Sequence, residues 1–65
     1  MRTFIISPIE RGHSDVIIGA ISPYDAFLKF VDKHYSPDWY PHQDGDQYSV
    51  FNDITSFGFK VVEEI

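Results

Sequence analysis

Only one segment of this sequence has the periodicity of an amphipathic helix, and it limits which folds are open to the chain. Ser22 suits a helix N-cap, Pro23 the first helical position, and Asp25 completes an S-x-x-D start pattern. Apolar side chains then recur at spacings of three and four, at Tyr24, Phe27, Leu28, Val31 and Tyr35. Ser36-Pro37 ends the pattern. A helix of roughly 13 residues is marginal alone, so it has to pack on a sheet.

The segments on either side of this helix are predicted strands, because they are rich in β-branched and aromatic residues. They run over Arg2–Ile6, Asp15–Ile21, Gln47–Phe51 and Phe57–Ile65. A short loop, Ile9–Ser14, favours an antiparallel hairpin of the first two. We therefore predict an α+β fold and a small single domain over residues 1–65, ordered β-β-α-β-β, with an antiparallel sheet and one helix packed on one face.

Two turns complete this prediction. Asp44-Gly45 is a two-residue turn signal, so Trp39–Gln43 is expected to pair briefly with Asp46–Val50. Pro41 would confine that pairing to a sheet edge. A second turn is expected over Asn52–Ser56.

A single helix covers only two or three strands, which leaves one sheet face open. We expect a core formed by Phe27, Leu28 and Val31 against Phe4, Ile18, Phe59 and Val61. Apolar residues of the opposite parity then face away from the helix: Ile5, Ile17, Ile21, Val62, and either Phe51 or Val50. Either the loops Ser7–Ser14 and Ser36–Asp46 cover them, or a few apolar residues simply stay exposed. The alternative is that the uncovered sheet face forms a homodimer or another partner contact.

The chain's small size makes this choice important. Its 65 residues include no cysteine, so neither disulfides nor thiolate zinc sites can reinforce the core. Aromatic residues make up 17% of the chain and have to supply much of the packing. An undersized core without a covalent staple favours assembly with another chain.

Charge excludes several classes of partner. The formal net charge is −5, and the few basic residues are scattered, so we expect no direct nucleic-acid binding. The same charge would be repelled by an anionic membrane. No apolar stretch approaches the roughly 20 residues of a membrane span, and the start of the chain does not resemble a signal peptide. We therefore expect a cytoplasmic protein without membrane contact.

The segment Ser36–Asp46 is the candidate partner-binding site. It holds adjacent Trp39 and Tyr40, residue types enriched at binding hot spots, together with polar neighbours at Asp38, His42, Asp44 and Asp46. This combination predicts a larger protein partner with a basic surface around an apolar pocket. The alternative is structural: Trp39 caps the end of the core and Tyr40 lies half-buried beside it.

A metal site is the alternative function. His42, Asp44 and Asp46 supply one imidazole and two carboxylates, which would suit zinc, manganese or iron. The order of residues does not match an EF-hand, and a solvated acidic turn explains them better than a metal site does. We predict no bound cofactor.

The sequence favours a non-enzymatic role. No phosphate-binding glycine loop is present, and a chain this short has little room for a catalytic pocket and its supporting residues. Small acidic proteins of this plan are common among accessory proteins of phages and mobile elements, an analogy of type only. We therefore predict an inhibitor or adaptor that docks on a larger host protein, in one version as a nucleic-acid mimic.

Overall fold

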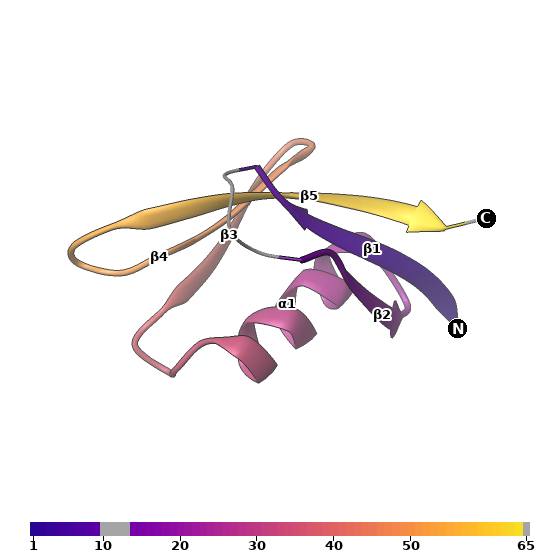
Figure 1. Ribbon diagram of the computed structural model, residues 1–65, viewed down its shortest axis with the longest axis horizontal. Helices are drawn as coiled ribbons and strands as arrows, with labels where there is room; N and C mark the ends of the chain where they lie inside the picture. Colours follow the sequence, from indigo (N-terminus) through magenta and orange to yellow (C-terminus); the bar gives the residue numbers. More distant parts are fainter. Residues whose placement is uncertain (10–13, 65) are drawn as a thin grey trace.

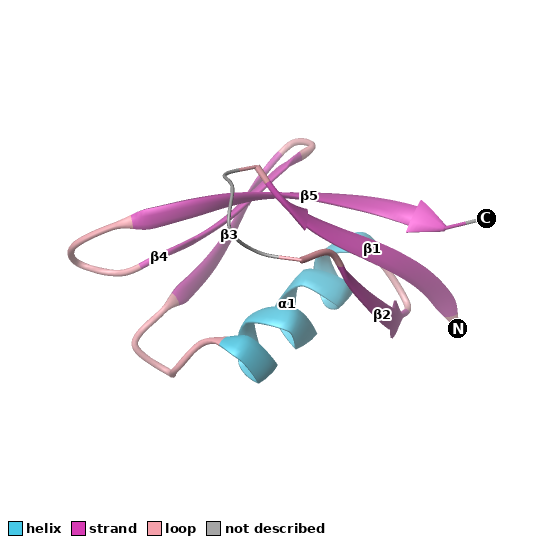
Figure 2. Cartoon of the chain, viewed as in Figure 1, coloured by secondary structure: helices cyan, strands magenta, loops and turns pink. Residues whose placement is uncertain are grey.

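The computed structural model describes residues 1–9 and 14–64 and confirms the α+β fold. Its elements are β1 (Arg2–Pro8), β2 (Val16–Ala20), α1 (Pro23–His34), β3 (Tyr40–Asp44), β4 (Gln47–Phe51) and β5 (Ser56–Glu64). The five strands form one antiparallel sheet in the order β2-β1-β5-β4-β3, and α1 lies against one of its faces (Figures 1 and 2). None of the described helices is long and apolar enough to cross a membrane.

The strand β5 joins two hairpins. Its residues Phe59–Glu64 pair with β1, and its residues Ser56–Phe59 pair with β4. The hairpin β1–β2 therefore lies beside one end of β5, and the hairpin β3–β4 beside the other. This stagger divides the sheet face opposite the helix, here called the outer face, into two separate areas.

The helix begins as the sequence predicts. The Oγ of Ser22 accepts a hydrogen bond from the backbone N–H of Asp25 at 3.1 Å. Asp25 also forms an ion pair with Lys29, four residues later, with 3.4 Å between Nζ and Oδ2. The helix ends at His34, and Tyr35 is its C-cap, with its N–H bonded to the carbonyl of Val31.

The buried side of the helix differs from the predicted stripe at Tyr24, which is 38% exposed, and at Leu28. Leu28 is 36% exposed, so its predicted place in the core is wrong, whereas Phe30 is 6% exposed and packs edge-on against Phe59. The buried stripe is centred one residue further round the helix than the spacing alone suggested. The core residues share a position between helix and sheet: Phe4, Ile6, Ala20, Ala26, Phe27, Phe30, Val31, Tyr48, Val50 and Phe59.

The strand boundaries shift slightly from the predicted ones. β1 continues to Pro8, β2 is shorter at both ends than Asp15–Ile21, and β5 begins at Ser56. Most of the predicted loop Ile9–Ser14 lies outside the described residues. So does Ile65, the last residue of the predicted Phe57–Ile65 strand. The register of the β1–β2 pairing places Ile5 opposite Ile17.

The region Trp39–Val50 needs a larger correction. The pairing is a full hairpin, β3–β4, with Asp44 opposite Gln47, so the turn is Gly45-Asp46 and not Asp44-Gly45. Gly45 has a φ of +62°, and no described non-glycine residue has a positive φ. Glycine at the first turn position is typical of a type II′ hairpin turn. As predicted, Pro41 lies on an edge strand.

Candidate functional site

The outer side of the β3–β4 hairpin carries an exposed aromatic pair. Tyr40 lies opposite Phe51 in the register, and their ring centroids are 5.7 Å apart. Tyr40 is 56% exposed and Phe51 is 40% exposed, so neither ring is needed to fill the core. The imidazole of His42, two residues along β3, meets the ring of Phe51 edge-on at 6.5 Å between centroids.

A shallow hollow lies beside Tyr40. It has a volume of about 280 Å³ and is lined by Tyr40, Asp38, Asn52, Asp53 and Ile54. Two carboxylates and a phenol ring around one hollow offer a basic side chain both an ion pair and an aromatic face.

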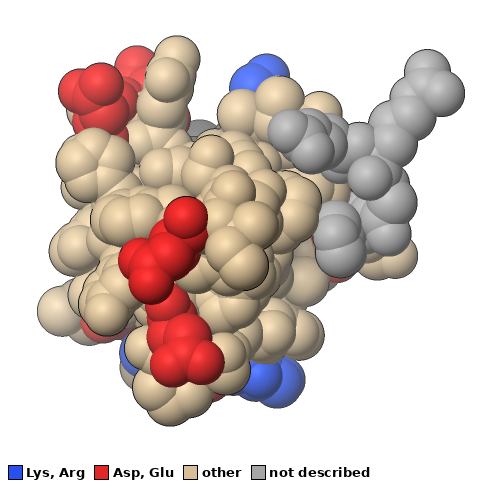
Figure 3. Space-filling model, turned by 90° about the vertical axis from the view of Figure 1, so that its left-hand side faces the viewer, with Lys and Arg blue, Asp and Glu red and all other residues tan. Residues whose placement is uncertain are grey.

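The turn between β4 and β5 is shaped by Asn52. Its Oδ1 accepts hydrogen bonds from the backbone N–H groups of Ile54 and Thr55, both at 2.8 Å. This Asx-type turn presents Ile54 at 91% exposure. Figure 3 views the molecule from this end, where acidic side chains form a column within an uncharged surface. We call the following set the aromatic–acidic surface: Asp38, Tyr40, His42, Phe51, Asp53 and Ile54.

Trp39 does not belong to this surface. Its ring stacks on Phe57 at 5.7 Å between centroids and meets Tyr35 edge-on at 5.1 Å. The side chain is partly buried against the core. Trp39 immediately precedes the β3 edge strand, where neighbouring side chains point to opposite faces, so it lies on the helix side while Tyr40 lies on the outer face. The sequence prediction had placed both in one binding site; the structure separates them.

Asp44 and Asp46 lie at the far tip of the hairpin. Asp44 lies four positions along β3 from Tyr40, a distance of roughly 13 Å along an extended strand. Burial and the neighbouring carboxylate of Asp46 raise the pKa of the Tyr48 hydroxyl. That hydroxyl is 3.2 Å from the Nε2 of Gln43, which donates to it. The six predicted site residues are therefore split among three places, and only Asp38, Tyr40 and His42 share the aromatic–acidic surface.

The metal hypothesis receives no geometric support. Within residues 1–9 and 14–64, no three His, Asp or Glu side chains come together in an arrangement that could hold a metal ion. His42, Asp44 and Asp46 are therefore not brought into one site.

A second exposed area lies on the outer face of the other hairpin. Ile17 of β2 is opposite Ile5 of β1, and Ile5 is opposite Val62 of β5, so the three form a row across the strands. Ile17 is 65% exposed, Val62 is 54% exposed and Ile5 is partly exposed. We call these three residues the apolar row. The described loops do not bury it, as one interpretation of the sequence required.

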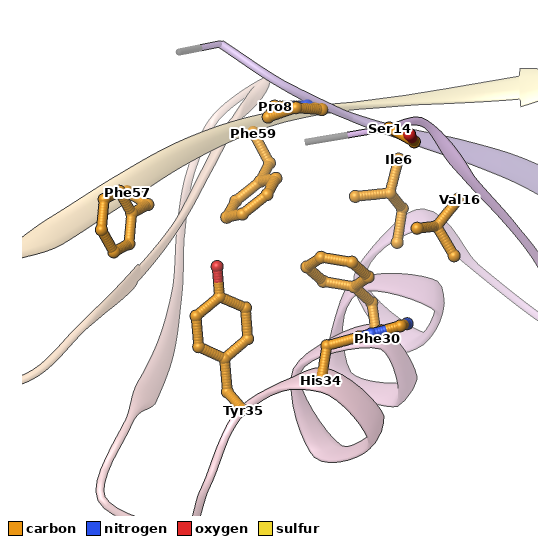
Figure 4. Close-up of a pocket in the computed structure, with 9 residues that line it drawn as sticks. All are labelled: Ile6, Pro8, Ser14, Val16, Phe30, His34, Tyr35, Phe57 and Phe59. Carbon is orange, nitrogen blue, oxygen red and sulfur yellow. The ribbon is translucent and has the colours of Figure 1, made fainter. Parts of the chain in front are cut away.

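A larger cavity than the hollow beside Tyr40 opens between the end of α1 and the sheet. It has a volume of about 480 Å³ and a largely apolar lining that includes Phe30, Tyr35 and Phe59 (Figure 4). Burial raises the pKa of the Tyr35 hydroxyl, which points toward β5. The cavity lining includes Pro8 and Ser14, which are close in sequence to residues 10–13, outside the described part of the chain, so we assign no site to this cavity.

Comparison with known proteins gives no relative from which to transfer a role. No protein-family model matches this chain, and searches of curated proteins and of solved structures returned no significant match.

The residues that sequence reasoning missed come from the β4–β5 turn. Phe51, Asp53 and Ile54 join the site only because the hairpin register brings the end of β4 beside the start of β3. The signal that could have found them is the pairing of Tyr40 with Phe51, which follows once Gly45-Asp46 is taken as the turn.

Proposed function

We propose that this chain is a non-enzymatic binding module that docks on a larger protein through the aromatic–acidic surface. The observation that carries the proposal is the exposed pair Tyr40 and Phe51, with Ile54 exposed beside it. Adjacent exposed aromatic and aliphatic side chains are costly to leave in water and are the usual anchors of protein interfaces.

The carboxylates beside these anchors define the chemistry of the partner. Asp38 and Asp53 line the hollow next to Tyr40. A lysine or arginine of the partner would enter this hollow, while apolar groups of the partner would cover Phe51 and Ile54. An inhibitor or adaptor of a protein with a basic, partly apolar surface fits this chemistry.

Affinity capture with matched baits tests the proposal. The wild-type chain is compared with Tyr40→Ser/Phe51→Thr and with the control Tyr24→Ser/Leu28→Gln, which removes exposed apolar groups from α1, outside both proposed contact surfaces. Circular dichroism verifies that each bait is folded. A partner retained by wild type and control but reduced about tenfold or more with the surface variant supports the proposal. Equal capture by all three baits, or no specific capture, overturns it.

Salt dependence tests the nucleic-acid-mimic version of the function. With a captured partner in hand, Asp38→Asn/Asp53→Asn should weaken binding at low ionic strength and flatten its dependence on salt. Binding by the wild-type chain that does not change with salt would reject mimicry of phosphates and leave apolar docking.

Self-association through the outer face is the second interaction that we propose. The specific observation in its favour is the apolar row, whose Ile17 and Val62 are more than half exposed. Sedimentation velocity over a range of protein concentrations tests it, and a chain that is monomeric throughout that range overturns it.

A further inference from the structure

The outer face around the apolar row has an ordered pattern on β5. Along this strand the outward side chains are Lys60, Val62 and Glu64, all exposed. The register places Thr3 opposite Glu64 and Ser7 opposite Lys60 on the neighbouring strand β1. A cation and an anion therefore lie at equal spacing on the two sides of Val62.

Strand β1 has a matching pattern about Ile5. Thr3 and Ser7 flank Ile5 on the outer face, and two apolar side chains lie one step further out. The Sδ of Met1 lies 3.1 Å from the position that a Cβ of Gly19 would take, and the Cδ1 of Ile9 lies 3.1 Å from the corresponding position at Gly58. Met1 and Ile9 are 92% and 62% exposed. The outward order is therefore apolar, hydroxyl, apolar, hydroxyl, apolar.

Such a pattern complements itself under a twofold rotation. Partner residues of antiparallel strands lie on lines that cross the strands, so the apolar row runs across β2, β1 and β5. An axis along this row, between two sheets packed face to face, sets each row residue over its own copy and reverses the strand direction. A residue two positions after the row then faces the residue two positions before it in the other copy.

We propose that two copies of this chain pack outer face to outer face about an axis along the Ile17–Ile5–Val62 row. Lys60 of each copy then pairs with Glu64 of the second copy, Thr3 faces Ser7, and Met1 faces Ile9. This inference rests on the proposed self-association and specifies its geometry. A second copy is the occupant because the charges and the apolar side chains match those of the same surface.

The charges also discriminate between twofold arrangements. An axis along β5 would set Lys60 over Lys60 and Glu64 over Glu64, which repel. An axis along β1 would set Met1 over Met1. It would also exchange the two neighbours of β1, so Glu64 would face Gly19, because both are register partners of Thr3. Glu64 would then have no cation opposite. Of these three axes, the one along the apolar row gives both Lys60 and Glu64 an opposite charge.

The proposed dimer leaves the aromatic–acidic surface free. The β3–β4 hairpin pairs with the Ser56–Phe59 end of β5, whereas the apolar row crosses β5 at Val62. Tyr40 and Phe51 therefore lie beyond the area that the second copy covers. Docking on a larger protein and pairing with a second copy are compatible.

Charge reversal tests the geometry. The dimer dissociation constant is measured by sedimentation equilibrium for wild type, Lys60→Glu, Glu64→Lys and the double reversal Lys60→Glu/Glu64→Lys. Each single change should raise the constant about tenfold or more, because a cation–anion pair becomes a like-charge pair at both symmetric positions. The double reversal should restore it to within about threefold. Lys33→Glu and Asp32→Lys, on the exposed side of α1, are the matched controls and should leave it unchanged.

The outcomes separate the two levels of the proposal. A wild-type chain that stays monomeric contradicts self-association itself. A dimer that is weakened by Ile17→Ser but not by either charge reversal, or that the double reversal fails to restore, keeps self-association and overturns the twofold register.

Discussion

Trp39 stacks on Phe57, with ring centroids 5.7 Å apart and ring planes inclined by 26°. Phe57 in turn belongs to the partly buried side chains around the core. The one tryptophan of this chain therefore packs against the core at the end of the sheet.

Trp39→Ala should lower the free energy of unfolding. Because the ring is only partly buried, we expect a loss of about 2 kcal/mol, below the 3–5 kcal/mol typical of fully buried aromatic residues. Urea denaturation followed by far-ultraviolet circular dichroism measures it. Tyr40→Ala is the matched control and should cost less than about 1 kcal/mol. Equal losses for the two variants would contradict the assignment of Trp39 to the core.

Gly45→Ala should destabilise the hairpin through its backbone alone. An added Cβ would meet no atom within 4 Å, but the residue has a φ of +62°, which costs alanine about 1–2 kcal/mol. Gly45→Asn should cost less, because asparagine tolerates positive φ. Thermal unfolding of the two variants beside wild type checks this order. A neutral Gly45→Ala would mean that the turn adopts another conformation in solution.

Ser22→Ala should cost about 1 kcal/mol of stability, since it leaves the N–H of Asp25 without its 3.1 Å acceptor. Ser22→Gly should cost only a few tenths of a kcal/mol, because glycine is itself a fair N-cap. Chemical denaturation separates the two. A loss for glycine as large as that for alanine would indicate that the Ser22 hydroxyl contributes more than capping.

The ion pair between Arg2 and Glu63 should make stability depend on acid pH. The side-chain hydrogen bond from Arg2, at 2.7 Å, holds the pKa of Glu63 below its ordinary value. Because the folded-state pKa lies below that of the unfolded chain, about 4.3, the contribution is complete above this value. It is lost as the pH falls through the folded-state pKa.

Glu63→Gln should therefore lower the melting temperature slightly at pH 7, and the difference from wild type should shrink as the solution is acidified. Both groups of the pair are exposed, so the effect is small. Asp32→Asn, on the exposed side of α1, is the control. A difference that persists unchanged at acid pH would mean that the carboxylate charge is not what stabilises the fold.

Local patterns predicted the fold well. The cap at Ser22, the alternation along Phe57–Val62 and the unalternating apolar strand around Ile17 depend on neighbours in sequence, and each was correctly interpreted. The helix stripe was wrong at Tyr24 and Leu28, because apolar residues outnumber the positions that the sheet can cover. Spacing alone does not choose among them, whereas contact with Phe59 does select Phe30.

The candidate site was predicted less well because it depends on register. Moving the turn by one residue, from Asp44-Gly45 to Gly45-Asp46, changes the residue opposite Tyr40 from Ser49 to Phe51. That change brings the β4–β5 turn and Ile54 beside Tyr40. Adjacency in sequence had instead suggested that Trp39 and Tyr40 act together, which an extended backbone prevents.

The position of β5 between β1 and β4 has a consequence for how the chain folds. The hairpins β1–β2 and β3–β4 each join strands that are close in the sequence. The pairing of Thr3 with Glu64, in contrast, joins segments from opposite ends of the sequence. An isolated hairpin is marginal in water, so neither half gains much until this long-range pairing forms. Bringing β1 and β5 together costs loop-closure entropy before the β1–β5 pairing can stabilise the sheet. This favours slow, all-or-none folding. Structure at one end of β5 should therefore appear together with structure at the other.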